Sequence, residues 1–88
     1  MLTSRQKTKV IEEFRRHEKD TGSADVQVAV LTREIDRLAQ HLKKHPKDNH
    51  SRRGLLKMVS RRKALLDYLK KEDEKRHSDV TKKLGLKK

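Results

Sequence analysis

The basic residues of this sequence are concentrated in one stretch. Residues 37–63 hold ten Lys or Arg side chains and a single acid, Asp48, so the stretch has a net charge of +9 out of +12 for the whole chain. Within it, Arg53, Lys57 and Arg61 are four residues apart, a spacing that aligns side chains along one face of a helix. A face that only keeps a protein in solution usually mixes both charge signs. The pattern therefore predicts a polyanionic partner, and a nucleic acid fits it best.

Histidines flank the acid in the same stretch. His41 and His45 are four residues apart at a predicted helix end, and Asp48 and His50 follow closely. This spacing is permitted for zinc, but a metal ion would have to enter a strongly positive segment. Imidazole groups can instead donate hydrogen bonds to RNA phosphates and 2′-hydroxyl groups, or stack on a sugar or base. We therefore expect no metal site, and RNA contact and simple solvent exposure stay open as interpretations of these histidines.

Asp48 itself can be explained in two ways. An acid on a phosphate-binding surface weakens the attraction, so its presence needs a local reason. Its carboxylate could cap the following helix by accepting hydrogen bonds from N–H groups of the first turn. It could also accept hydrogen bonds from guanine N–H groups in a minor groove. The sequence alone favours neither role.

A second polar patch precedes another predicted helix. Thr21 and Gly22 lie directly before Ser23, a candidate helix cap, and Gln27 follows one turn later. Backbone N–H groups at a helix N-terminus can bind a phosphate or ribose, although a glycine turn by itself is more often a plain connection. Tyr68 could lie in the core or present its ring to RNA. Because the chain has only two aromatic residues, a stacking platform for single strands is not expected, and structured RNA is the predicted ligand.

Length and composition exclude several classes of protein. With 88 residues, of which 31% are hydrophobic and 43% charged, we expect a single domain over residues 1–88 with a small core and no enclosed active site. The sequence has no cysteine and no nucleophile or phosphate-loop motif, so neither an enzyme nor a cofactor is expected. No membrane span or signal peptide is predicted. The alternative interpretation is a basic helical protein that coats DNA or an anionic membrane without specificity.

The spacing of apolar residues predicts an all-α, four-helix protein: a long antiparallel helical hairpin with a short N-terminal and a short C-terminal helix. The predicted helices run from near Thr3 to just before Lys19, from Ser23 to His45, from about Ser51 to Lys71 and from about Asp73 to Gly85. The second has an apolar seam of alternating three- and four-residue steps, formed by Val28, Leu31, Ile35, Leu38 and Leu42. The third has an apolar stripe, formed by Leu55, Val59, Leu66 and Leu69.

Several runs of residues resemble one known family. These runs are DTGS at 20–23, VQVA at 26–29, HSRRGLLKMV at 50–59, LLDYL at 65–69 and KLGL at 83–86. They resemble the ribosomal protein S-fifteen family of the bacterial small ribosomal subunit. The similarity extends over essentially the whole chain without gaps, and the run at 50–59 is the most specific part of it.

The resemblance implies a four-helix protein that binds RNA. Members of that family attach early and directly to the central domain of small-subunit ribosomal RNA, brace a three-way junction there and help to nucleate assembly of the platform. They also form a bridge to large-subunit ribosomal RNA. The implied partners are these two RNAs and neighbouring platform proteins, with no membrane partner, and the free protein would be a monomer. The implied location is the ribosome, in the cytoplasm or in an organelle.

The resemblance also implies which residues contact RNA. Family contacts with the junction match Thr21, Gly22, Gln27 and Tyr68. Family contacts with the minor groove of an irregular helix, at a G·U pair next to a G·C pair, match His41, Asp48 and Ser51. From their charge and position alone, we add His45, Arg53, Lys57 and Arg61 as RNA-binding candidates. The chain departs from basic family positions at Glu34 and Ala64, so contacts made there by a positive charge are in doubt.

Overall fold

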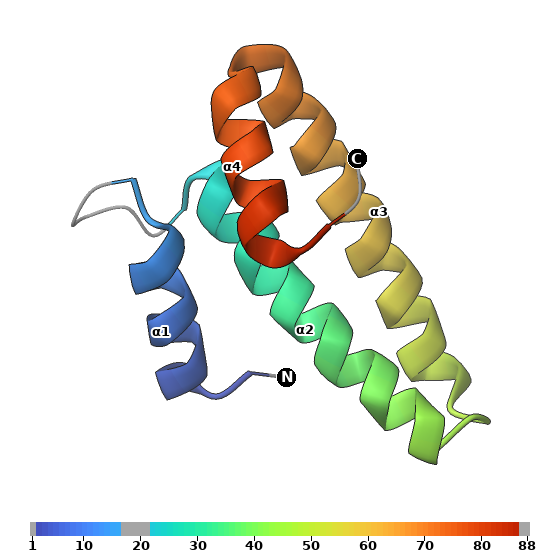
Figure 1. Ribbon diagram of the computed structural model, residues 1–88. Coiled ribbons are helices and arrows are strands. Elements are labelled where there is room, and N and C mark those ends of the chain that lie inside the picture. The colour runs from blue at the N-terminus through green and yellow to red at the C-terminus, as the bar shows by residue number, and fades with distance from the viewer. Residues whose placement is uncertain (1, 17–21, 87–88) are drawn as a thin grey trace.

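The computed structural model describes residues 2–16 and 22–86, and in these two ranges the chain forms four α-helices and no strand. The helices are α1 (Ser4–Phe14), α2 (Ala24–Lys44), α3 (Asn49–Glu72) and α4 (Glu74–Leu84). The two long helices, α2 and α3, form an antiparallel hairpin, α1 lies beside α2, and α4 packs against the half of the hairpin that is distant from its turn (Figure 1). The predicted all-α architecture of a long hairpin with two short helices is confirmed.

Side-chain caps set where the helices begin and end. Thr3 Oγ1 accepts a hydrogen bond from the Gln6 N–H at 3.2 Å, and the Gln6 side chain accepts one from the Thr3 N–H at 3.0 Å, so a capping box begins α1. Ser23 caps α2, as predicted, by accepting from Val26 N–H at 3.3 Å. At the other end of the chain, α4 ends at Gly85, whose φ of 69° lies in the left-handed region that glycine adopts without strain.

Buried side chains lie on two sides of α2. Val10 and Phe14 of α1 pack with Val26 and Ala29 of α2 in one cluster. The second cluster joins the three other helices through the buried side chains Val28, Leu69 and Val80. The predicted seam of α2 is only partly buried, with Val28 and Ile35 buried and the three leucines half-buried. Val26 and Ala29 are buried outside the predicted seam, because α2 packs against α1 as well as against α3 and α4.

Two predicted helix boundaries and one predicted core residue are wrong. Helix α1 ends at Phe14, four residues earlier than expected, because Arg15 is in an extended conformation. Helix α3 begins at Asn49 and not near Ser51, so its first turn takes up part of the predicted break. Val59 is 39% exposed and is not part of a buried stripe. This part of α3 contacts α2 alone, since α4 covers only the other end of the hairpin.

Candidate nucleic-acid interface

Asp48 organises the turn between α2 and α3. Its carboxylate accepts hydrogen bonds from the Ser51 N–H at 3.0 Å and from the Ser51 hydroxyl at 2.7 Å, and it pairs with His41 Nε2 at 2.9 Å. The capping role is therefore confirmed, and it explains why α3 begins at Asn49. A carboxylate offers about four acceptor positions, and three are used here. One acceptor position stays available to a ligand, and the side chain is about one third exposed.

These hydrogen bonds also fix the charge of the turn. The two bonds from Ser51 hold the pKa of Asp48 far below its ordinary value of 3.8, and the contact with His41 lowers it further. The carboxylate is therefore ionised at any pH near neutrality. An anionic hydrogen-bond acceptor, fixed in direction by a helix N-terminus, stands within the most basic part of the chain.

A shallow groove of about 820 Å³ runs along the hairpin next to this turn. Its walls come from both long helices, and its lining includes Glu34, His41 and His45 from α2 and Ser51 and Gly54 from α3. The two histidine rings lie with their centroids 4.7 Å apart. The structure therefore brings three of the predicted site residues, His41, His45 and Ser51, to one hollow surface.

The same side of α2 continues to the far end of the hairpin. Gln27, Glu34 and His41 are seven residues apart, or two helical turns, so their side chains follow one line with a small drift. Glu34 and His41 line the groove, which places Gln27 on the groove side as well. With a rise of 1.5 Å per residue, Gln27 and His41 are about 21 Å apart.

Helix α3 has a matching line of residues. Gly54, Arg61 and Tyr68 are also seven residues apart, and Gly54 lines the groove. The hairpin is antiparallel, so Tyr68 near the end of α3 lies at the same end as Gln27 near the start of α2. Tyr68 is 57% exposed, so of the two positions that the sequence left open, the surface one is correct.

The basic stripe of α3 is exposed. Arg53, Lys57 and Arg61 are all exposed, and within the described ranges no hydrogen bond or ion pair engages their charged groups. Arg62, one position further, is different: it is half-buried and donates to the Thr32 hydroxyl of α2 at 3.4 Å. The stripe therefore presents three cations to solvent, while its neighbour helps to join the two helices.

At the far end, Gly22 and Gln27 are joined by a hydrogen bond. The Gln27 side-chain amide donates to the Gly22 carbonyl at 2.7 Å, which fixes the amide and the start of α2 relative to each other. Thr21, the third predicted residue of this patch, lies outside the described residues. The structure therefore groups the site residues into two sets, one at each end of a single face of the hairpin.

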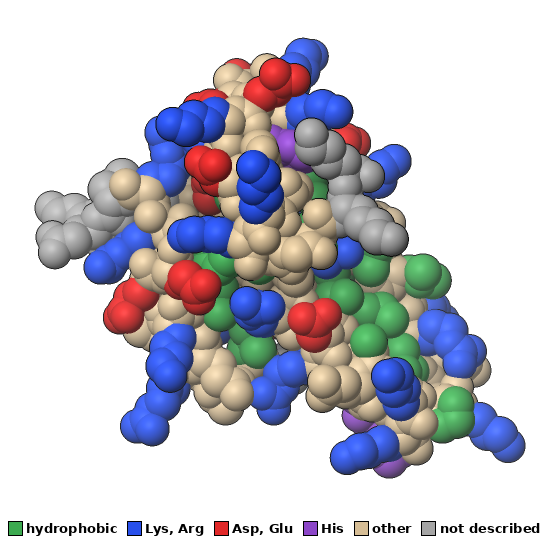
Figure 2. All heavy atoms as spheres, viewed as in Figure 1, with side chains coloured by type: hydrophobic (Ala, Val, Ile, Leu, Met, Phe, Trp, Pro, Cys, Tyr) green, Lys and Arg blue, Asp and Glu red, His purple; other side chains and the backbone are tan. Residues whose placement is uncertain are grey.

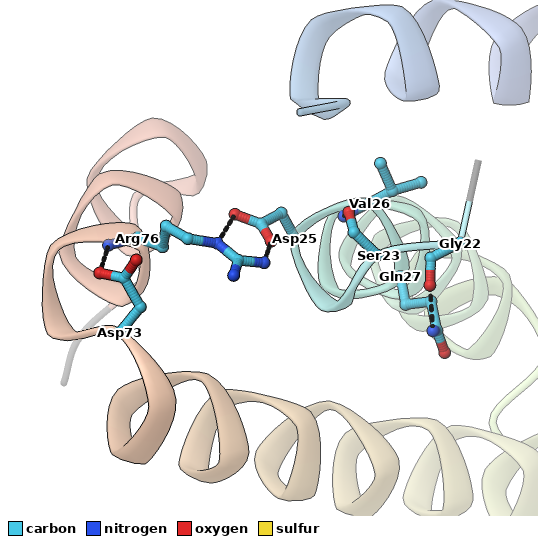
Figure 3. A network of polar contacts seen from close by, with 7 residues as sticks. All are labelled: Gly22, Ser23, Asp25, Val26, Gln27, Asp73 and Arg76. Carbon is cyan, nitrogen blue, oxygen red and sulfur yellow. Dashed lines mark hydrogen bonds and ion pairs between the residues drawn. The ribbon is translucent and has the colours of Figure 1, made fainter. Parts of the chain in front are cut away.

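The sequence analysis missed an ion pair at this end. Asp25 of α2 is 6% exposed, and both of its carboxylate oxygens accept from the guanidinium group of Arg76 in α4 (Figure 3). The hydrogen bonds with Asp25 raise the pKa of Arg76, and weaker effects of Asp73 and Tyr68 act in the same direction. Asp25 lies in the first turn of α2, where an acid is favourable to the helix dipole. Two residues 51 positions apart give no sequence signal of pairing.

The two ends of the molecule differ in their acidic side chains. On the face shown in Figure 2, acidic side chains are mixed with basic ones over α1, α4 and the neighbouring end of the hairpin, whereas the end at the α2–α3 turn shows basic, histidine and apolar side chains. In the described part of the chain, no three His, Cys, Asp or Glu side chains form a group that could hold a metal ion. None of the described helices is long and apolar enough to cross a membrane.

Comparison with known proteins decides the family. The sequence profile of the family described as Ribosomal protein S15 matches residues 7–87. The chain is 55% identical over 87 residues to a protein of Carboxydothermus hydrogenoformans named "Small ribosomal subunit protein uS15", which covers 99% of this chain and 98% of that protein. A protein of the same name from Staphylococcus carnosus is 54% identical, covering 97% of this chain and 96% of that protein. The chain belongs to the ribosomal protein S15 family.

Membership of the S15 family confirms the resemblance drawn from the sequence runs. A further S15 relative, from Brevibacillus brevis, is 55% identical over 85 residues and has the same printed name. In each of these three alignments at least 96% of the relative is covered. The match therefore includes both ends of the face described above.

The Asp48 cap makes a prediction for acid stability. Folding lowers the pKa of Asp48, so the ionised carboxylate stabilises the fold above the ordinary pKa of 3.8, and this stabilisation is lost as the pH falls below that value. Asp48→Asn is the matched variant, because Asn also caps helices and cannot titrate. Thermal melts from about pH 6 to about pH 2 should show a steeper loss of Tm for the natural protein. Parallel curves for the two proteins would contradict this account of the turn.

Proposed function

We propose that this chain is a structural, non-catalytic component of the small ribosomal subunit that binds ribosomal RNA as a single helical domain. The proposal is supported above all by one observation: the end of the α2–α3 hairpin next to its turn carries exposed cations together with an ionised, directed acceptor, Asp48. Cations alone would suit any polyanion. A fixed acceptor among them suits a ligand that offers hydrogen-bond donors between its phosphates, as RNA does.

The cations of α3 supply affinity. Arg53, Lys57 and Arg61 lie along about two turns of an exposed helix face, and their charged groups are available to phosphate oxygens. Binding of phosphates releases condensed counterions, so this part of the affinity depends strongly on salt and carries no sequence information. His45, exposed beside His41 in the groove wall, adds a ring that can donate to a phosphate or 2′-hydroxyl group.

In this proposal the turn between α2 and α3 determines which site on the RNA is bound. The minor groove of an RNA helix is wide and shallow, so short side chains can reach base edges and 2′-hydroxyl groups there. The guanine amino group is the hydrogen-bond donor among the base edges of that groove. In our proposal Asp48 accepts from this amino group with its remaining acceptor position, and His41 and Ser51 hold the carboxylate in place and contact the adjacent G·U and G·C pairs.

The far end of the face supplies a second contact. Gly22, Gln27 and Tyr68, with Thr21 beside them in sequence, bind the three-way junction in the central domain of small-subunit RNA. Because α2 and α3 are continuous helices over this length, the two contacts are held about 21 Å apart. The protein therefore binds well only where an RNA presents a junction and a G·U/G·C site with the matching separation. This bracing of two RNA segments is how it would nucleate assembly of the platform.

The remaining partners follow from the same proposal. The bound protein bridges to large-subunit ribosomal RNA and adjoins neighbouring platform proteins, and it is a monomer when free. It acts in the ribosomes of the cytoplasm. The alternative function, non-specific coating of DNA or an anionic membrane, is supported only by the concentration of positive charge. It gives no role to Asp48 beyond the helix cap, and the two functions differ in what they predict for this residue.

Asp48→Ala tests the site-choosing role. We expect binding to RNA with an intact G·U/G·C site to weaken roughly 10- to 100-fold, the range for one directed base contact, and binding to a plain duplex to be unchanged or tighter. Filter binding or fluorescence anisotropy with the two RNAs measures this. Asp48→Asn, which keeps the cap, is the control for helix stability. An equal loss on both RNAs would reduce Asp48 to a capping residue and remove the main support for the proposal.

Arg53→Ala and Lys57→Ala test the phosphate contacts. Each variant should weaken binding to all RNAs alike and should reduce the slope of log K against log salt by about one. Titrations between about 50 and 200 mM salt measure the slope. Lys7→Ala, which removes an exposed cation from α1, should leave the slope unchanged. Unchanged slopes for both α3 variants would mean that the stripe does not contact phosphate.

A further inference from the structure

The α3–α4 corner and the first turn of α2 are joined by one continuous polar network. Asp73 ends α3, where its N–H donates to the Leu69 carbonyl at 2.8 Å, and it also begins α4 by accepting from the Arg76 N–H at 3.2 Å. The Arg76 side chain then reaches Asp25 in the first turn of α2 with two charge-assisted hydrogen bonds. The backbone and the side chain of Arg76 are thus fixed to different helices.

This network is close in sequence to both halves of the proposed junction contact. Tyr68 is on α3 little more than one turn before Asp73, and Gln27 is on α2 two residues after Asp25. Figure 3, which looks nearly along α2, shows that Asp25 and Gln27 leave the helix on opposite sides. The ion pair therefore holds one side of the first turn while Gln27, bonded to Gly22, occupies the other side.

We propose that the Asp25–Arg76 ion pair is a positioning element for RNA binding, which fixes the first turn of α2 against the α3–α4 corner and so keeps Gly22 and Gln27 in register with Tyr68. This inference rests on the proposed function and adds two residues that do not themselves touch RNA in that proposal. Asp25 is 6% exposed and engaged by Arg76, so it acts through the helix that it holds.

A physical reason for such a tie is that the junction contact spans two elements. If the first turn of α2 could rotate or fray, only a fraction of molecules would present Gln27 and Tyr68 together, and the apparent affinity would fall by that fraction. A bidentate pair between a carboxylate and a guanidinium group restricts both distance and angle, which a lysine in place of Arg76 would not do. The pair is also costly to break, because a buried carboxylate would be left without its partner.

Whether Asp25→Asn raises or lowers the affinity for RNA distinguishes a positioning role of the ion pair from a purely electrostatic one. Asp25→Asn removes a negative charge from a protein with a net charge of +12, and simple attraction to phosphate predicts tighter binding of every RNA. The positioning role predicts the reverse, weaker binding, and only for RNAs that include the three-way junction. Asp79→Asn is the matched control, since it makes the same change of charge at an exposed position of α4.

The experiment measures affinities of the full chain for two fragments of small-subunit RNA, one with the junction and one with the G·U/G·C helix alone. Asp25→Asn and Arg76→Lys should each weaken junction binding roughly tenfold, as expected if the competent fraction falls to one tenth, and should leave helix binding unchanged. The double variant should be no weaker than either single one, because both remove the same tie. Amide hydrogen exchange at Gly22, Val26 and Gln27 should be faster in both single variants.

Each other outcome overturns part of the account in a recognisable way. Equal losses on both RNAs would show general destabilisation and not positioning, and unchanged or tighter junction binding by Asp25→Asn would leave only electrostatics. Unchanged amide exchange would show that the pair does not hold the turn, whatever the RNA result. If the natural protein bound the junction no better than a plain duplex, the proposed function would fail, while exchange would still report separately on the ion pair.

Discussion

The repulsion among like charges at one end of the hairpin is the constraint on which the rest of the structure depends. Residues 37–63 carry a net charge of +9, and half-buried leucines lie in the parts of α2 and α3 next to the turn. Self-repulsion opposes such compaction, and phosphate groups relieve it. The buried clusters lie instead toward the other end, where α1 and α4 pack on α2. The buried apolar side chains are therefore concentrated at one end of the molecule, and the excess of positive charge is concentrated at the other.

Within that cationic end, the one acid has both a structural and a chemical consequence. Asp48 caps α3 and so fixes the start of the helix that carries the basic stripe. Because Asp48 remains ionised, it provides a hydrogen-bond acceptor among basic side chains that are all donors. Such a surface can distinguish an RNA that offers a guanine amino group from one that offers phosphates alone. In the proposed binding mode, affinity and specificity come from different residues, and the carboxylate of Asp48 is held by hydrogen bonds within the protein.

Local sequence signals predicted the parts of this structure that depend on neighbours in sequence. The cap at Ser23, the three-and-four spacing in α2 and the break after His45 are all of this kind. Predictions failed where burial depends on a helix that is distant in the sequence. Val59 is exposed because neither α1 nor α4 covers it, and Val26 is buried because α1 packs on it. For the candidate site, the residue types and the positive sign of the charge could be predicted from the sequence. The ion pair between Asp25 and Arg76 could not, because 51 positions separate the two residues.

The most direct test of the central claim is chemical footprinting of the purified protein on full-length small-subunit ribosomal RNA at moderate ionic strength. If the hairpin binds by phosphates along one face and by polar groups at its two ends, protection should be confined to one junction and one irregular helix in the central domain. It should also persist in the presence of excess competitor DNA. Protection spread evenly over duplex regions, or abolished by the competitor, would contradict the account.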